Sequence, residues 1–278
     1  MRLTSFENAG LTFDVTDQGP LDGPAVVLLH GFPADRHCWD EIGEHLTRAG
    51  LRVLAPDQRG YSPRARPQGR AAYAMAELVG DVLALLDAAG LDRAHLVGHD
   101  WGGAVAWAAA GTHPDRFATL TVLSTPHPAA FARALRHPAQ AWHSLYMLWF
   151  QLPWLPERTF SRIFPRALRR SGLPPDVTQR YLAAMAQPGA LTAALGWYRA
   201  SRLSHGLVHR IRIPTTYVWG RGDRFFSRRG AEATGPLVTA DYRFVELAEG
   251  HWLPEVAAAV CAREIEHRAS TGATGDPV

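Results

Sequence analysis

The 278-residue sequence predicts an α/β fold, in which helices flank a mostly parallel central sheet and a block of helices is inserted into it. Two observations support this prediction. Short apolar runs alternate with segments of helical periodicity, and the alternation stops after Leu123 and resumes near Ile213. Alternating strands and helices require crossover connections, and these make neighbouring strands parallel.

The predicted strands are short, continuous apolar runs bounded by Gly, Pro or Asp. Runs of this kind are typical of strands that are buried on both faces. Residues 3–16 are expected to form an antiparallel hairpin at one edge of the sheet. The six central strands are predicted at 25–29, 52–55, 94–97, 119–123, 215–219 and 242–247.

Segments with helical spacing of apolar residues separate these runs. They predict helices over 39–48, 73–89, 102–112 and 254–267, and a frayed tail from Ala269 onwards. Between the two halves of the sheet, prolines at 138, 153, 156, 174, 175 and 188 are expected to divide the chain into several helices.

The chain is therefore divided into a first core part (1–125), a helical cap (126–206) and a second core part (207–278). The cap would cover the carboxyl edge of the sheet, where ligands bind in open α/β sheets.

Composition excludes several classes of protein. No apolar stretch approaches the ~20 residues of a spanning helix, and the N-terminus lacks an apolar signal region. Two cysteines, Cys38 and Cys261, form neither a disulfide framework nor a metal cluster. All 29 basic residues are arginine, and they are scattered along a chain whose net charge is only +3. We expect a bacterial, cytoplasmic monomer or homodimer with no metal, no cofactor and no nucleic-acid or membrane partner.

The strongest local signal is the pattern Gly98-x-Asp100-x-Gly102 between a predicted strand and a predicted helix. Glycines two residues before and after a central side chain permit a sharp turn that exposes it. Alone, the pattern also fits a capped turn. Its place between a buried strand and a helix favours a nucleophile at Asp100.

Three further residues follow predicted strands in a matching order. Phe32 lies in His-Gly-Phe-Pro after the first central strand, where a backbone N–H of an oxyanion hole is expected. Asp223 follows the strand at 215–219, and His251 follows the last strand. Separately, Asp223 could cap a helix and His251 could be an ordinary loop histidine. Together they predict a triad with Asp100, and an oxyanion hole from the amides of Phe32 and Trp101.

An aspartate nucleophile narrows the reaction. Attack on an acyl carbon would give an anhydride, with little advantage over direct hydrolysis. Attack on an sp³ carbon gives an alkyl ester, which water can then cleave. His251, oriented by Asp223, would activate that water. A strained epoxide oxygen or a halide fits as the leaving group.

At these residues the sequence resembles the epoxide hydrolase and haloalkane dehalogenase branch of the α/β-hydrolase superfamily. The resemblance covers nearly the whole chain and lies in residues 30–33, 57–62 and 98–103. It implies the α/β-hydrolase fold and a reaction that needs no cofactor. Phe32 favours the epoxide hydrolases, because haloalkane dehalogenases commonly carry a halide-binding Asn at that position.

The resemblance also implies two cap tyrosines that protonate the opening epoxide. Residues 196–199 resemble the segment of the second tyrosine, which assigns that role to Tyr198. Residues 146–151 resemble the segment of the first, but Trp149 stands where the tyrosine is expected. An indole N–H donates a hydrogen bond but is no general acid near neutral pH.

Because Trp149 stands in place of the expected tyrosine, three alternatives for the function stay open. Tyr198 could act alone or with Tyr146 on an epoxide. The indoles of Trp101 and Trp149 could instead hold a halide, which would indicate a haloalkane dehalogenase. The chain could also be a weakly catalytic, ligand-binding homologue.

Tryptophans are concentrated around the predicted site. A cap this aromatic over a carboxylate predicts a dry pocket for a small apolar substrate, an epoxide or a haloalkane. The residues expected to line it are His30, Tyr146, Trp149, Phe150 and Trp252.

Overall fold

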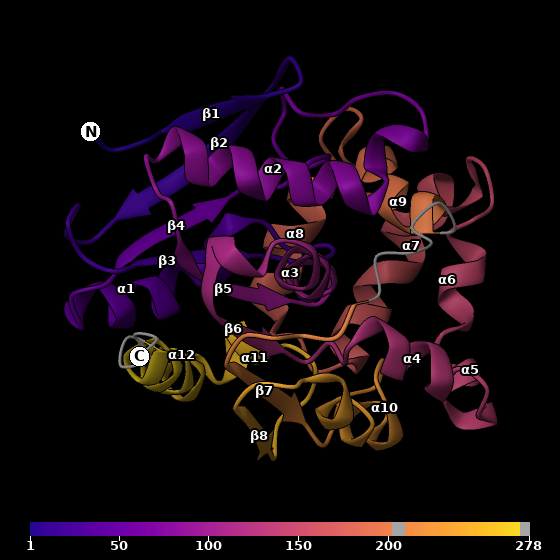
Figure 1. Ribbon diagram of the computed structural model, residues 1–278. Helices are drawn as coiled ribbons and strands as arrows, with labels where there is room; N and C mark the ends of the chain where they lie inside the picture. Colours follow the sequence, from indigo (N-terminus) through magenta and orange to yellow (C-terminus); the bar gives the residue numbers. More distant parts are fainter. Residues whose placement is uncertain (202–208, 273–278) are drawn as a thin grey trace.

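The computed structural model describes residues 1–201 and 209–272, which form an eight-stranded sheet with helices on both faces (Figure 1). The strand order is β1-β2-β4-β3-β5-β6-β7-β8. Strands β1 and β2 form an antiparallel hairpin that pairs antiparallel with β4, and all other neighbours are parallel. The predicted mostly parallel sheet with an edge hairpin is confirmed.

The strands lie close to their predicted positions, with the edge hairpin reaching further than expected. Their bounds are β1 (Ser5–Asn8), β2 (Leu11–Gln18), β3 (Ala25–Leu29), β4 (Arg52–Pro56), β5 (Ala94–His99), β6 (Phe117–Leu123), β7 (Thr215–Gly220) and β8 (Tyr242–Leu247).

Two hydrophobic cores lie on the two faces of the sheet. Alternate residues of β3 enter them: Val27 and Leu29 pack in one core, and Val26 and Leu28 in the other. The first core contains α2 (Met75–Ala88) and α3 (Trp101–Thr112), and the second contains α1 (Asp40–Arg48) and α12 (Ala258–Gly272). Both faces of β3 to β7 are therefore buried, which explains their continuous apolar runs. The same expectation is wrong for β8, because it lies at the edge of the sheet and none of its residues is fully buried.

The C-terminal segment differs from the prediction. The single helix expected over 254–267 is divided at Ala257, whose φ of −142° ends α11 (Leu253–Val256) before α12 begins. Helix α12 continues to Gly272, and Ala269 is buried against the second core, so the tail predicted from Ala269 is wrong for 269–272. Residues 273–278 lie outside the described residues.

The elements of the inserted segment between β6 and β7 are helices. Among the described residues its α-helices are α4 (Pro128–Ala134), α5 (Pro138–His143), α6 (Leu145–Trp149), α7 (Leu155–Arg170), α8 (Pro175–Met185) and α9 (Ala190–Ala200). Figure 1 shows α5, α6 and α7 at the side of the molecule opposite the N-terminus. The predicted boundary between cap and second core part, at 206/207, falls outside the described residues.

The remaining short helices are η1 (Arg36–Trp39), η2 (Ala71–Tyr73), η3 (Pro114–Arg116), α10 (Arg228–Glu232) and η5 (Gly235–Leu237). Within 1–201 and 209–272, no helix is both long enough and apolar enough to span a bilayer.

Candidate active site

Asp100 occupies a strained turn between β5 and α3. Its φ of 51° lies in the left-handed region that side-chain-bearing residues avoid. The turn needs glycine on both sides, because a Cβ at Gly98 would lie 2.3 Å from the carbonyl oxygen of Gly102, and one at Gly102 would lie 2.1 Å from that of Leu29. The turn presents the Asp100 carboxylate at the carboxyl edge of the sheet.

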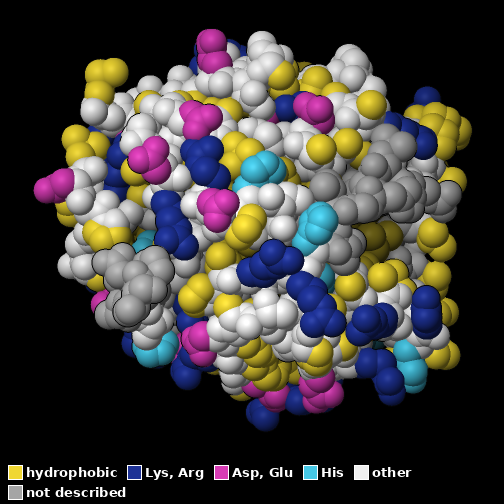
Figure 2. Space-filling model, viewed as in Figure 1, with side chains coloured by type: hydrophobic (Ala, Val, Ile, Leu, Met, Phe, Trp, Pro, Cys, Tyr) yellow, Lys and Arg dark blue, Asp and Glu magenta, His cyan; other side chains and the backbone are white. Residues whose placement is uncertain are grey.

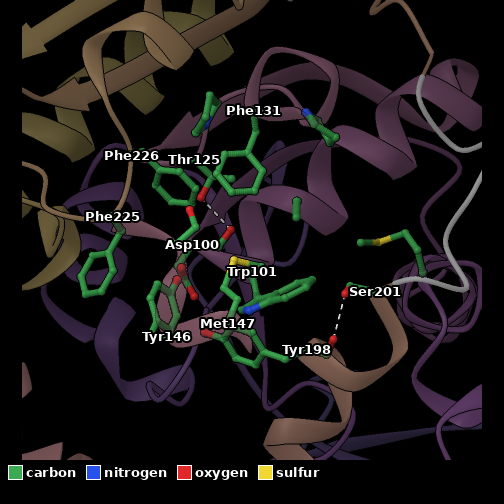
Figure 3. Close-up of a pocket in the computed structure, with 15 residues that line it drawn as sticks. Asp100, Trp101, Thr125, Phe131, Tyr146, Met147, Tyr198, Ser201, Phe225 and Phe226 are labelled. Atoms are coloured by element: carbon green, nitrogen blue, oxygen red, sulfur yellow. Dashed lines mark hydrogen bonds between the residues drawn. The ribbon is translucent and has the colours of Figure 1, made fainter. Parts of the chain in front are cut away.

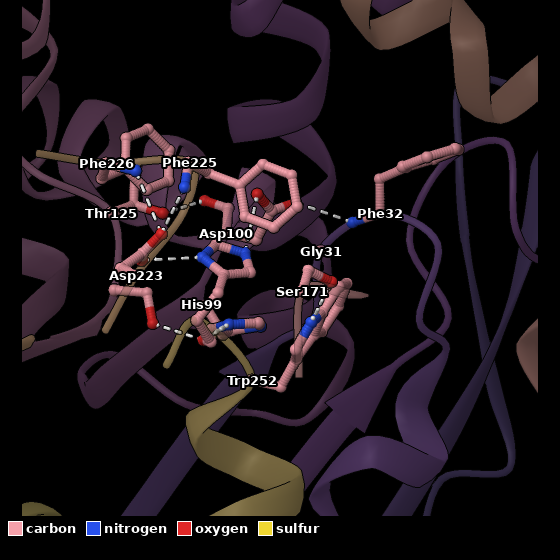
Figure 4. Close-up of polar contacts among 12 residues, drawn as sticks. Gly31, Phe32, His99, Asp100, Thr125, Ser171, Asp223, Phe225, Phe226 and Trp252 are labelled. Atoms are coloured by element: carbon pink, nitrogen blue, oxygen red, sulfur yellow. Dashed lines mark hydrogen bonds and ion pairs between the residues drawn. The ribbon is translucent and has the colours of Figure 1, made fainter. Parts of the chain in front are cut away.

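His251 lies between the two predicted aspartates, Asp100 and Asp223, which are labelled in Figure 4. Its Nε2 is 3.4 Å from Oδ2 of Asp100, and its Nδ1 is 2.9 Å from Oδ2 of Asp223. The other oxygen of Asp223 accepts hydrogen bonds from the amides of Phe225 and Phe226, at 2.7 and 3.0 Å. Asp223 is thereby fixed by its own loop and orients the imidazole ring.

One of the two predicted oxyanion-hole amides contacts the Asp100 carboxylate. The Phe32 amide donates a hydrogen bond of 2.8 Å to Oδ1. Trp101 begins α3 directly after Asp100, and no hydrogen bond between its amide and this carboxylate is found in the described part of the chain. The role of the Trp101 amide as an oxyanion-hole donor, which would act at a later state of the reaction, stays a prediction.

Residues that the sequence did not single out hold the reacting groups in place. The carbonyl oxygen of His251 accepts hydrogen bonds from the Ser124 hydroxyl at 2.6 Å and from Nε2 of His99 at 2.9 Å. The Thr125 hydroxyl donates to the carbonyl of Asp100 at 2.7 Å. Ser124 and Thr125 directly follow β6, and this position at the carboxyl end of a strand is the sequence signal that could have indicated them.

Charge couples His251 to Asp100. Burial disfavours a charged His251, but Asp223 and Asp100 outweigh it and raise the pKa of the imidazole to about 10. Burial likewise opposes ionisation of Asp100, but the hydrogen bond and charge of His251 lower the pKa of this carboxyl. At neutral pH the Asp100 carboxyl is thus ionised and the proton stays on His251.

Two adjoining apolar cavities meet at Asp100, and both are lined by Asp100, Tyr146, Tyr198 and Phe225. The smaller lobe, of about 250 Å³, extends past Trp101 and Thr125 to Phe131 of α4 (Figure 3). The larger lobe, of about 510 Å³, extends along α7, where Ile163, Phe164 and Leu168 line it. The carboxylate therefore stands at the junction of two apolar spaces of unequal size.

Comparison with known proteins places this fold and site in a family. Residues 24–258 match the sequence model of the family described as "alpha/beta hydrolase fold". The chain belongs to the α/β-hydrolase family. It is similar to the AB hydrolase superfamily protein YfhM of Bacillus subtilis, with 38% identity over 262 residues that cover 88% of this chain and 89% of that protein.

Two epoxide hydrolases are also similar to this α/β-hydrolase. Epoxide hydrolase A of Mycobacterium tuberculosis is 31% identical over 293 residues, covering 88% of this chain and 90% of that one. A solved structure described as a novel epoxide hydrolase from metagenomes of hot environments gives a TM-score of 0.83 at 29% identity, covering 95% and 97% of the two chains. The expected α/β-hydrolase fold is confirmed, and the chain is a hydrolase of the epoxide hydrolase-like type.

The two cap tyrosines of this α/β-hydrolase lie together at the junction of the lobes. The ring of Tyr198 packs edge-on against those of Tyr146 and Trp101, at centroid distances of 6.1 and 5.0 Å. Burial, followed by the charge of Asp100, raises the pKa of Tyr146. The structure thus places Tyr146, three residues before Trp149, as the partner of Tyr198.

Trp149 takes a different position. It lines the larger lobe only, whereas Trp101 lines the smaller lobe and packs edge-on against Tyr198. The two indoles therefore line different lobes.

The other predicted pocket residues divide into two groups. Phe32, Phe150 and Trp252 line the larger lobe. His30 lines neither lobe, so its predicted place in the pocket is wrong. The reason is that His30 is fully buried below Phe32, with Nδ1 bonded to the carbonyl of Gly31 and Nε2 accepting from the Gln58 amide at 3.1 Å.

Phe225 is a site residue that the sequence did not indicate. It lines both lobes, and its ring centroid lies 4.7 Å from that of His251. Its amide also fixes Asp223, so one residue links the acid, the base and the cavity wall. In residues 1–201 and 209–272 no cluster of three or more His, Cys, Asp or Glu side chains could hold a metal ion.

Proposed function

We propose that this α/β-hydrolase converts an apolar epoxide to a vicinal diol through an alkyl ester on Asp100. One observation carries the proposal: an ionised carboxylate stands at the junction of two apolar lobes with the hydroxyls of Tyr146 and Tyr198 beside it. A carboxylate that faces proton donors across an apolar space suits attack on carbon with release of an alkoxide.

In the first step, Oδ2 of Asp100 attacks one epoxide carbon and the carbon–oxygen bond of the ring breaks. The released oxygen takes a proton from the paired tyrosines. Oδ1, held by the Phe32 amide at 2.8 Å, becomes the carbonyl oxygen of the ester. Ester formation also removes the negative charge of Asp100 that helps to keep the His251 proton in place.

In the second step, His251 acts as the general base. With Asp100 esterified, only Asp223 still favours the proton on the imidazole, so the pKa of His251 falls and it releases this proton, which balances the proton that the tyrosine gave to the epoxide oxygen. The neutral imidazole then takes a proton from water. The hydroxide attacks Cγ of Asp100, and the developing oxyanion lies at Oδ1 against the Phe32 amide. Breaking the ester releases the diol and leaves one oxygen from water on Asp100.

Apolar walls support an uncharged substrate. Besides Asp100 and the two tyrosines, the lining that both lobes share is Phe225, and Phe150 lines the larger lobe. The haloalkane alternative has less support, because Trp101 and Trp149 line different lobes.

A single turnover in ¹⁸O-labelled water tests the mechanism. We expect one label in the peptide that contains Asp100 and diol formation from styrene oxide, with no halide released from 1-bromobutane. Turnover with an unlabelled Asp100 peptide would refute the ester mechanism. Halide release without diol formation would indicate a dehalogenase, and tight ligand binding without turnover of either compound would indicate a binding homologue.

A further inference from the structure

Exposed apolar side chains form a continuous row on the outer side of the cap. Leu145, Leu148 and Leu152 are three and four residues apart, which places them on one side of α6 and the turn that follows it. Trp142 on α5 is 75% exposed, and Trp154, before α7, is 59% exposed. We call these five residues the apolar edge.

The apolar edge is unusual for this molecule. Elsewhere in the described residues, the large hydrophobic side chains that are exposed, such as Leu21 and Phe244, are separated along the chain. Single exposed apolar residues are ordinary, whereas contiguous ones mark an interaction surface. Figure 2 shows hydrophobic side chains gathered along the side of the molecule that α5 and α6 occupy in Figure 1.

Positive charge surrounds the apolar edge. Residues 126–172 contain seven arginines and a single acidic residue, Glu157. All seven arginines are exposed, and none forms an ion pair within the described parts of the chain. Glu157 is bonded to Arg199 of α9 and so does not neutralise them. The arginines are Arg133, Arg136, Arg158, Arg162, Arg166, Arg169 and Arg170.

We propose that the apolar edge docks this α/β-hydrolase on the surface of a membrane that contains anionic phospholipid. Tryptophan and leucine side chains would enter the boundary between headgroups and acyl chains, and the arginines would meet the lipid phosphates. Docking of this kind needs no spanning helix. It revises the expectation of no membrane partner, which the composition of the chain had suggested.

Charge favours a lipid surface over a second copy of the chain. A twofold interface brings the same patch of both subunits together. Through the apolar edge it would oppose two groups of seven arginines, with only one paired carboxylate in each segment. An anionic membrane instead complements this charge, at about fivefold in the partition coefficient for each basic residue near the surface.

The apolar edge adjoins the entrance of the larger lobe. Trp149 follows Leu148 in α6 and lines this lobe, together with Ile163, which is 50% exposed, and Arg170. An apolar substrate dissolved in the bilayer would thus reach Asp100 without crossing bulk water. This delivery rests on the proposed function, whereas the docking does not.

Co-sedimentation with lipid vesicles tests the docking. The wild-type protein is expected to bind vesicles of phosphatidylcholine and phosphatidylglycerol (3:1), to bind phosphatidylcholine alone at least tenfold more weakly, and to be released by 0.5 M salt. Leu145→Ser with Leu148→Ser should lower partitioning at least tenfold, and Arg162→Gln with Arg166→Gln by about 25-fold. Leu21→Ser is the matched control, because Leu21 and Leu145 are both 46% exposed.

Controls separate docking from folding and from catalysis. Leu145 and Leu148 line neither lobe, so their variants should keep the wild-type rate on dissolved styrene oxide. Asp100→Asn should bind vesicles as the wild type does, whatever the reaction proves to be. Equal binding to neutral and anionic vesicles, or equal loss in Leu21→Ser, would overturn the proposal. The proposal would also be overturned if the wild-type protein bound no vesicles and formed a dimer that the double variant Leu145→Ser, Leu148→Ser dissociates.

Discussion

Replacing Tyr146 by phenylalanine tests the pairing of the two cap tyrosines. The substitution removes one hydroxyl from the junction of the lobes and leaves the ring, which packs edge-on against Phe150 and Phe225 at centroid distances of 5.6 Å. Tyr198 alone then remains to protonate the leaving oxygen.

The size of the effect follows from the charge on that oxygen. A hydrogen bond to a charged group contributes about 1.5–3 kcal/mol, so losing one hydroxyl should slow ester formation by about 10- to 150-fold. Tyr198→Phe should have a similar effect. The double variant leaves neither tyrosine hydroxyl and should lose about 10²- to 10⁴-fold, the scale of general acid catalysis.

Single-turnover kinetics with mass detection of the alkyl-enzyme measure the ester-forming step directly. Tyr73→Phe is a matched control, because it also removes one bonded hydroxyl, donated to the carbonyl of Pro67 outside both lobes. Trp149→Phe should change substrate affinity in the larger lobe more than the rate of ester formation. A full rate in Tyr146→Phe with a 10-fold or greater loss in Trp149→Phe would refute the assignment of Tyr146.

Three other changes test the triad and the fold. His251→Gln should accumulate the alkyl-enzyme, seen as a mass increase equal to the substrate; a normal rate would mean that another base acts. Asp100→Asn should lower the pKa of His251 below about 10, because one of the two carboxylates is neutralised; an unchanged imidazole titration by NMR would contradict the coupling. Arg52→Ala should lower the free energy of unfolding at pH 7 by about 3 kcal/mol, since it removes the buried partner of Asp17 and leaves the carboxylate only the half-exposed Arg2, at 3.4 Å, and the Leu3 amide. Burial alone would raise the pKa of Asp17, but Arg52 lowers it, so this loss should shrink as the pH falls below about 4 in urea denaturation; a loss independent of pH would refute the role of the pair.

The central strands and the turn at Asp100 were predictable because their determinants are local. A strand buried on both faces leaves a continuous apolar run, as Ala25–Leu29 does. The turn at Asp100 needs glycines at 98 and 102, because backbone carbonyls occupy the space of their Cβ atoms. The triad of Asp100, Asp223 and His251 could be predicted because each residue follows a strand, so only the order of the strands along the chain is needed.

The lining of the cavity was less predictable because it depends on how short helices are rotated. The break at Ser144 between α5 and α6 sets which side chains of α6 face inward, and packing against Tyr198 and Phe225 selects Tyr146. His30 was misplaced for a related reason. The Gln58 amide that binds its ring lies 28 residues away, and nothing in the local sequence indicates that contact.

The unequal lobes on either side of Asp100 have a stereochemical consequence. Under the proposed function, we expect a disubstituted epoxide with arms of different length to place the longer arm in the space of about 510 Å³ and the shorter in that of about 250 Å³. That orientation would determine which ring carbon faces Oδ2 of Asp100, and attack from behind would invert that carbon. We therefore expect the difference in volume between the two lobes to set the handedness of the diol and which enantiomer of a racemic mixture is consumed first.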